Sequence, residues 1–143
     1  MRYLGLDLGT KTLGVSISDP TGLIASSYTI IRHNEEYDRL ITDVKNIVLE
    51  KNVQEIVLGL PKNMNNTEGE RCEKTKEFKE MLERRTGLNV ILWDERLTTV
   101  SADKHMMESG IRREDRKKFV DEIAAVFILQ GYLDYLAMHP EEK

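Results

Sequence analysis

Apolar and polar residues alternate at the start of the chain, which is the pattern of a β-strand with two different faces. Within residues 2–8, three leucines occupy alternate positions and Asp7 lies on the opposite face. Turn residues then separate two further stretches, residues 13–19 and 23–31, that also have strand character. Because such short turns join antiparallel neighbours, the first part of the chain predicts a meander of three antiparallel strands.

The pattern then changes to apolar residues every three or four positions, which predicts a helix followed by a buried strand. We expect Asn34 to cap a helix whose apolar stripe runs from Tyr37 to Val48. Residues 53–60 form a short apolar strand. Its central run, Ile56-Val57-Leu58, is typical of a parallel strand that is buried on both faces.

The rest of the chain alternates between helix and strand. A capping box starting at Thr67 predicts a helix that ends at Gly87. The remaining predicted elements are a strand at residues 89–93, a helix from Thr98 or Thr99 to Ser109-Gly110, a charged loop at residues 111–118, and a last helix from Phe119 to about Met138.

The predicted order of elements is βββαβαβαα, which indicates an α/β fold. Three antiparallel strands followed by alternating helices and strands give a mixed five-stranded sheet with flanking helices. The alternating part is expected to be parallel with right-handed crossovers. Residues 1–143 contain no internal repeat and no linker-like segment, so we expect a single domain.

Composition narrows the class of protein further. The chain has 143 residues, of which 40% are hydrophobic and 32% charged, as in ordinary globular proteins. No apolar run approaches the length of a membrane span, and the start of the chain does not have the pattern of a signal peptide. One cysteine allows no internal disulfide and suits the cytoplasm. The net charge of −4 argues weakly against a large nucleic-acid surface, although local clusters matter more.

Asp7 raises the first question of function, because a carboxylate in a central strand is costly to desolvate without a compensating partner. Three explanations are open: a ligand for a metal ion, part of a phosphate-binding loop, or a strand end satisfied by the Gly9-Thr10 turn. Asp7 alone does not distinguish them.

Two further acidic sites give Asp7 possible partners. Asp94 and Glu95 follow the fifth strand, and strand alternation sends only one of them toward Asp7. Asp121 starts the last helix and shares a face with Ala124 and Ala125, whose small side chains would let that helix approach the sheet closely. Each site alone has an ordinary explanation, a solvated turn or a favourable charge at a helix start.

Together, carboxylates from a strand, a strand end and a helix start indicate a site for divalent cations. Converging negative charges repel one another unless a cation neutralises them, and Mg²⁺ (or Mn²⁺) prefers oxygen ligands. Such ions support phosphodiester cleavage, in pairs about 4 Å apart in many enzymes. The chain has no zinc-binding motif.

Five stretches of the sequence resemble the YqgF branch of the RuvC-like Holliday junction resolvases. They are GLDLGTK with LGV near the start, GLP at residues 59–61, DERLTT at 94–99, and DEIAA at 121–125. The resemblance covers nearly the whole chain and implies a ribonuclease H-like fold and a metal-dependent nuclease. Family members are proposed to trim the 5′ end of precursor 16S ribosomal RNA. The resemblance also implies that Asp7, Glu95 and Asp121 form the acidic site. Thr12 departs from the arginine that often follows the family's lysine.

Basic residues near these acids suggest how a nucleic acid would be held. Residues 111–118 contain five cations and two anions, just before Asp121. Phosphates are a natural partner for such a cluster, although charge runs are usually only solvated. The predicted substrate-binding residues are Lys11, Lys62, Arg96, Arg112, Arg113, Arg116, Lys117 and Lys118. The three histidines have no metal-ligand spacing and receive no predicted role.

Other functions remain to be weighed against a nuclease that acts on ribosomal RNA. The DLGT motif also resembles the first phosphate loop of sugar kinases, but the expected single domain and the missing second loop argue against a kinase. A resolvase of branched DNA and a non-catalytic nucleic-acid-binding or ribosome-assembly module stay open. The protein is expected to act as a monomer or homodimer, with nucleic acid as its partner and no membrane.

Overall fold

The computed structural model describes residues 1–60, 70–94 and 113–140, and within these only the backbone of residues 70, 71 and 113–123. The strands are β1 (Tyr3–Leu8), β2 (Thr12–Ser18), β3 (Ala25–Arg32), β4 (Glu55–Leu60) and β5 (Val90–Asp94). The helices are α1 (Tyr37–Lys51), α2 (Glu70–Thr86) and α4 (Arg113–Met138). The expected cap at Thr67 and the expected helix after Thr98 or Thr99 lie outside the described residues.

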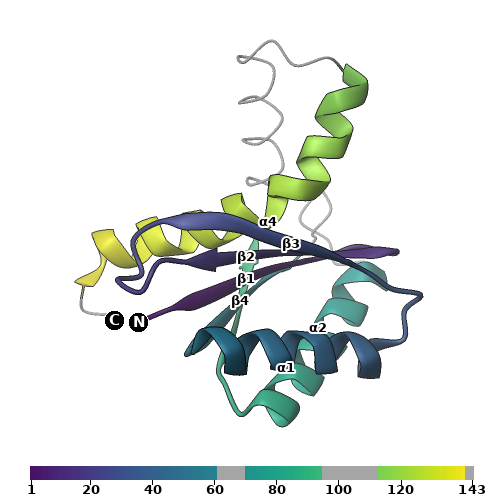
Figure 1. Ribbon diagram of the computed structural model, residues 1–143, viewed down its shortest axis with the longest axis horizontal. Coiled ribbons are helices and arrows are strands. Elements are labelled where there is room, and N and C mark those ends of the chain that lie inside the picture. Colours follow the sequence, from purple (N-terminus) through teal and green to yellow (C-terminus); the bar gives the residue numbers. More distant parts are fainter. Residues whose placement is uncertain (61–69, 95–112, 141–143) are drawn as a thin grey trace.

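The five strands form one mixed sheet in the order β3-β2-β1-β4-β5. β2 pairs antiparallel with both β1 and β3, whereas β4 lies parallel to both β1 and β5. Helices α1 and α2 cover one face of the sheet and α4 crosses the other (Figure 1). The predicted α/β architecture, an antiparallel meander extended by parallel strands, is confirmed. β1 is the central strand of the sheet.

Strand alternation divides the core into two layers. Leu4, Leu6 and Leu8 pack into the layer formed with α1 and α2, whereas Tyr3 packs on the α4 side. β4 contributes to both layers, as its apolar run predicts, because Ile56 and Leu58 face α1 and α2 while Val57 faces α4. Side chains on the α4 face of β1 therefore include that of Asp7.

Two predicted helix boundaries are wrong. Asn34 does not cap α1: the N-cap position is Glu36, whose side chain makes no capping hydrogen bond, and the turn before it is fixed instead by His33 and Glu35. Residues 111–118 are not a loop throughout, because α4 already begins at Arg113. The segment is rich in Arg and Lys, which favour helix, and its early acidic residues complement the helix dipole.

The predicted end of the second helix is confirmed. Gly87 lies just after α2 with a φ of 72°, and its N–H donates to the Glu83 carbonyl over 3.0 Å. Cys72 and Phe78 of α2 are buried, as expected.

None of the described helices is long and apolar enough to cross a membrane.

The turn between β2 and β3 depends on the ionised form of Asp19. The Asp19 carboxylate accepts the backbone N–H of Ile24 over 3.0 Å and that of Leu23 over 2.9 Å, together with the Thr21 hydroxyl. These donors, with Ile24 contributing most, hold the pKa of Asp19 well below the ordinary value of an aspartate.

We predict that Asp19→Asn destabilises the protein at neutral pH and that the difference from wild type shrinks below about pH 4. A lowered pKa in the folded state contributes stability above the pKa of the unfolded chain, and this contribution is lost as the pH falls. Urea unfolding of both proteins at pH 7 and at pH 3 measures it. An equal difference at both pH values would contradict this account of the turn.

Candidate active site

Asp7 is the described carboxylate around which the candidate site is built. It is the last but one residue of β1, opposite Gly14 of β2, and its side chain is half-buried. Among the described residues, none donates a hydrogen bond to this carboxylate or forms an ion pair with it. A half-buried carboxylate without donors is costly, so its surroundings suit a cation. Oxygen is the ligand that Mg²⁺ and Mn²⁺ prefer, so the donor type fits the implied metal.

Helix α4 lies unusually close to β1 beside Asp7. A Cβ atom added to Gly5 would lie 2.7 Å from the Leu129 Cβ and 2.9 Å from the Ala125 carbonyl oxygen, so only glycine fits there. The buried Ser16 hydroxyl of β2 donates to the same Ala125 carbonyl over 2.7 Å. With Ala124 also buried, the close approach predicted from the two alanines is confirmed.

The contacts along α4 fix its direction relative to β1. The Tyr132 ring packs against Tyr3, near the start of β1, with 6.1 Å between ring centroids. Leu129 and Ala125 lie over Gly5, two residues further along the strand. Helix α4 therefore runs opposite to β1, and its earlier turns lie toward the carboxyl end of the strand.

Strand alternation at the end of β5 shows on which face of the sheet Asp94 lies. Trp93 faces α4, where its ring contacts Tyr132 and Tyr135 with centroid separations of 5.8 and 5.9 Å. By alternation, the half-buried Asp94 lies on the opposite face, away from the face that carries Asp7. β5 ends at the same edge of the sheet as β1, because both are parallel to β4.

The turn between β1 and β2 presents Lys11 to solvent and is held by a residue that sequence reasoning missed. The Gly9 N–H donates to the Thr12 carbonyl over 2.7 Å. The His33 N–H donates to the Lys11 carbonyl, and the His33 ring contacts the Gly9 carbonyl, each over 2.9 Å. His33 has no motif spacing, so only its place directly after an expected strand pointed to this turn.

The other predicted residues are placed only in part. Glu95, Lys62, Arg96 and Arg112 lie outside the described residues. Asp121 belongs to α4, one turn before Ala125, and its side chain is not among those described. The same holds for the basic residues Arg113, Arg116, Lys117 and Lys118 at the start of α4. Within the described part of the chain, no three potential ligands gather around one point.

Comparison with known families separates a nuclease from the sugar kinase that the DLGT motif also resembles. The model of the RuvX family, described as Holliday junction resolvase, matches residues 1–135. The chain belongs to the RuvX family. RuvX chains are nucleases, so the protein is a hydrolase of phosphodiester bonds and not a sugar kinase. The resemblance to the YqgF branch, the same family, is confirmed.

Individual relatives support the family and the fold. A protein of Agathobacter rectalis named "Putative pre-16S rRNA nuclease" is 63% identical over 139 residues, which are 96% of this chain and 97% of the relative. RuvC of T. thermophilus, solved in complex with a Holliday junction substrate, superposes with a TM-score of 0.65 at 14% identity and covers 97% of this chain and 96% of RuvC. The fowlpox virus resolvase, solved with Holliday junction DNA, gives a TM-score of 0.54 at 15% identity, covering 95% of this chain and 99% of the resolvase. The predicted ribonuclease H-like fold is confirmed.

The approach of α4 to β1 predicts that Gly5→Ala lowers the free energy of unfolding by about 1–3 kcal/mol, because the added methyl group forces α4 away from the sheet. Ser26→Ala, an exposed change on β3, is the control and should change it by less than about 0.5 kcal/mol. Urea titration followed by circular dichroism measures both. Wild-type stability of the Gly5→Ala protein would show that α4 does not lie this close to β1.

Proposed function

We propose that the protein is a metal-dependent nuclease in which Asp7, Glu95 and Asp121 hold the divalent cation. The observation that carries the proposal is the position of Asp7. Its half-buried carboxylate has no partner among the described residues, and it lies on the face of the sheet that α4 covers. A carboxylate in this position is well suited to bind a cation.

The direction of α4 supports Asp121 as the second ligand. Ala125 lies over Gly5, and Asp121 precedes it by one helical turn, about 6 Å along the helix axis. Asp7 follows Gly5 by two residues, which is a similar distance along β1. Because helix and strand run in opposite directions, both steps lead toward the carboxyl end of β1, which supports Asp121 as a neighbour of Asp7.

The alternation along β5 supports Glu95, and not Asp94, as the third ligand. Trp93 lies on the α4 face and Asp94 on the other, so an extended chain continuing past Asp94 returns the next residue to the α4 face. The DERLTT motif, which the chain shares with the family, also indicates Glu95. We therefore assign the ligand role to Glu95.

The chemistry follows from placing carboxylates around one point. Three neighbouring negative charges repel one another unless they are neutralised, so Asp7, Glu95 and Asp121 would favour Mg²⁺ or Mn²⁺ over a monovalent cation. A bound cation of this kind supplies Lewis acidity for attack of water on a phosphodiester and offsets charge on the leaving oxygen. The protein side chains hold the ion and orient the phosphate.

We propose precursor 16S ribosomal RNA, at its 5′ end, as the substrate, in the cytoplasm. The name of the Agathobacter rectalis relative supports this choice, since the two chains align over nearly their whole lengths. Lys11 lies in the turn next to Asp7, and Arg113, Arg116, Lys117 and Lys118 occupy the start of α4. With Lys62, Arg96 and Arg112, these cations would hold phosphates on both sides of the acids.

Branched DNA is the second candidate substrate, because the family description names Holliday junction resolvase. RNA and DNA offer the same phosphates to Lys11 and to the start of α4, so these cations do not separate the two. Cleavage of a precursor 16S fragment and of a four-way DNA junction should be compared with the same protein, with Mg²⁺ and with Mn²⁺.

Replacing Asp7 separates catalysis from folding. We predict that Asp7→Asn lowers the cleavage rate by at least about 100-fold, because a ligand should matter at least as much as an outer-shell partner. Binding of the nucleic acid should change little. Without metal, the melting temperature of the variant should equal or exceed that of wild type, because a half-buried charge without a partner is removed.

The control for this experiment is Asp94→Asn, which removes the neighbouring carboxylate on the other face of the sheet. Its cleavage rate should stay close to that of wild type. Single-turnover cleavage and electrophoretic mobility shift measure rate and binding separately. An unchanged rate for Asp7→Asn would contradict the metal site. Binding of precursor RNA by a wild-type protein that cleaves neither substrate would favour a non-catalytic assembly module instead.

A further inference from the structure

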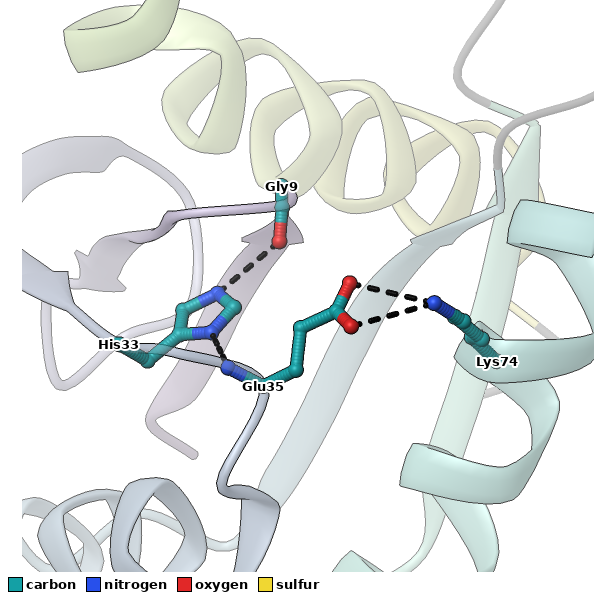
Figure 2. Close-up of polar contacts among 4 residues, drawn as sticks. All are labelled: Gly9, His33, Glu35 and Lys74. Atoms are coloured by element: carbon teal, nitrogen blue, oxygen red, sulfur yellow. Dashed lines mark hydrogen bonds and ion pairs between the residues drawn. The ribbon is translucent and has the colours of Figure 1, made fainter.

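His33 connects the turn beside Asp7 to the rest of the fold. It follows β3, and its backbone N–H donates to the Lys11 carbonyl while its ring contacts the Gly9 carbonyl, both over 2.9 Å. One residue thus holds the carbonyls on both sides of Thr10 (Figure 2 shows the ring contact). The turn that it holds begins two residues after Asp7 and contains Lys11.

The hydrogen bonds fix the tautomer of the His33 ring. The Glu35 N–H donates to Nδ1 over 2.9 Å, so Nδ1 is an acceptor and carries no proton. The proton of the neutral ring is therefore on Nε2, which donates it to the Gly9 carbonyl. Both ring nitrogens are engaged, so His33 has no lone pair left for a metal ion and no proton placed for transfer to a substrate.

Glu35 anchors the other side of this arrangement. Its φ of 63° is uncommon for a residue other than glycine, and in this conformation its N–H meets the His33 ring. Its carboxylate pairs with Lys74 of α2, with 3.2 Å from Nζ to each oxygen (Figure 2). The pair is exposed and contributes little stability by itself, but it ties the segment after β3 to α2.

We propose that His33 is a positioning residue that preorganises the β1–β2 turn, and with it Lys11, for the phosphate backbone of the nucleic acid. The proposal rests on the nuclease function proposed above. A turn that is already ordered loses little conformational freedom when a phosphate binds to Lys11. The entropic cost of binding is therefore smaller, and the affinity for the phosphate is higher. The His33 ring acts through the Gly9 carbonyl, beside the backbone bond from the His33 N–H to the Lys11 carbonyl, and it does not touch the reacting atoms.

The test compares three variants. His33→Leu removes both ring bonds, whereas His33→Gln keeps a side-chain donor for Gly9 and an acceptor for Glu35. His139→Leu is the matched control, because it makes the same change at the far end of α4, where the ring contacts the Tyr135 carbonyl. Melting temperatures confirm that each variant is folded.

Hydrogen exchange tests the order of the turn without requiring cleavage. In His33→Leu, the Gly9 amide, which donates to the Thr12 carbonyl, should exchange at least about tenfold faster than in wild type, which corresponds to one lost hydrogen bond. His33→Gln should restore most of the protection, and His139→Leu should leave it unchanged. Wild-type exchange in His33→Leu, or equal exchange in His33→Leu and His33→Gln, would overturn the proposal.

Binding and kinetics test the consequence for the nucleic acid. The Kd for a precursor 16S fragment, measured without divalent cation, should rise about 3- to 10-fold in His33→Leu and largely recover in His33→Gln. In cleavage assays KM should rise with little change in kcat. A fall in kcat at unchanged KM, or an unchanged Kd, would overturn the positioning role. If wild type cleaves nothing, the proposed nuclease function fails, while Kd and exchange still decide the role of His33.

Discussion

The close packing of α4 on the centre of the sheet is the contact on which the site depends. Gly5 has no side chain, so the Ala125 carbonyl reaches the sheet and accepts the Ser16 hydroxyl over 2.7 Å. This contact sets the height of α4 above β1, while the edge-to-face contact of Tyr132 with Tyr3 sets its direction. Together they fix how α4 lies along β1. A larger residue at Gly5 would change both the packing and the distance between the proposed ligands.

A second set of contacts organises the other side of Asp7. The β1–β2 turn is short, and its carbonyls are held by His33 from the end of β3. His33 is in turn fixed by Glu35, whose carboxylate pairs with Lys74 of α2. Asp7 and Lys11 thus lie in neighbouring segments with separate supports: α4 packs on the strand of Asp7, and the segment after β3 holds the turn of Lys11. Changes in one support should therefore leave the other largely intact.

Features that depend on local periodicity could be predicted from the sequence. The alternation in residues 2–8 places Asp7 opposite the leucines, and two alanines allow α4 to approach. Features that depend on tertiary partners could not. Asn34 looks like an N-cap, but the His33–Glu35 contact fixes the turn before α1. The charged run at 111–118 looks like a loop, but Arg, Lys and Glu also favour helix. His33 matters because β3 ends beside a turn far away in sequence, and no spacing rule reveals that.

The proposed convergence of Asp7, Glu95 and Asp121 on one divalent cation is tested most directly by anomalous diffraction from crystals grown with Mn²⁺. The account predicts an anomalous peak on the α4 side of the sheet, with carboxylate oxygens of all three residues within about 2.6 Å of it. A peak at another position, or an Asp121 carboxylate turned away from Asp7, would contradict it.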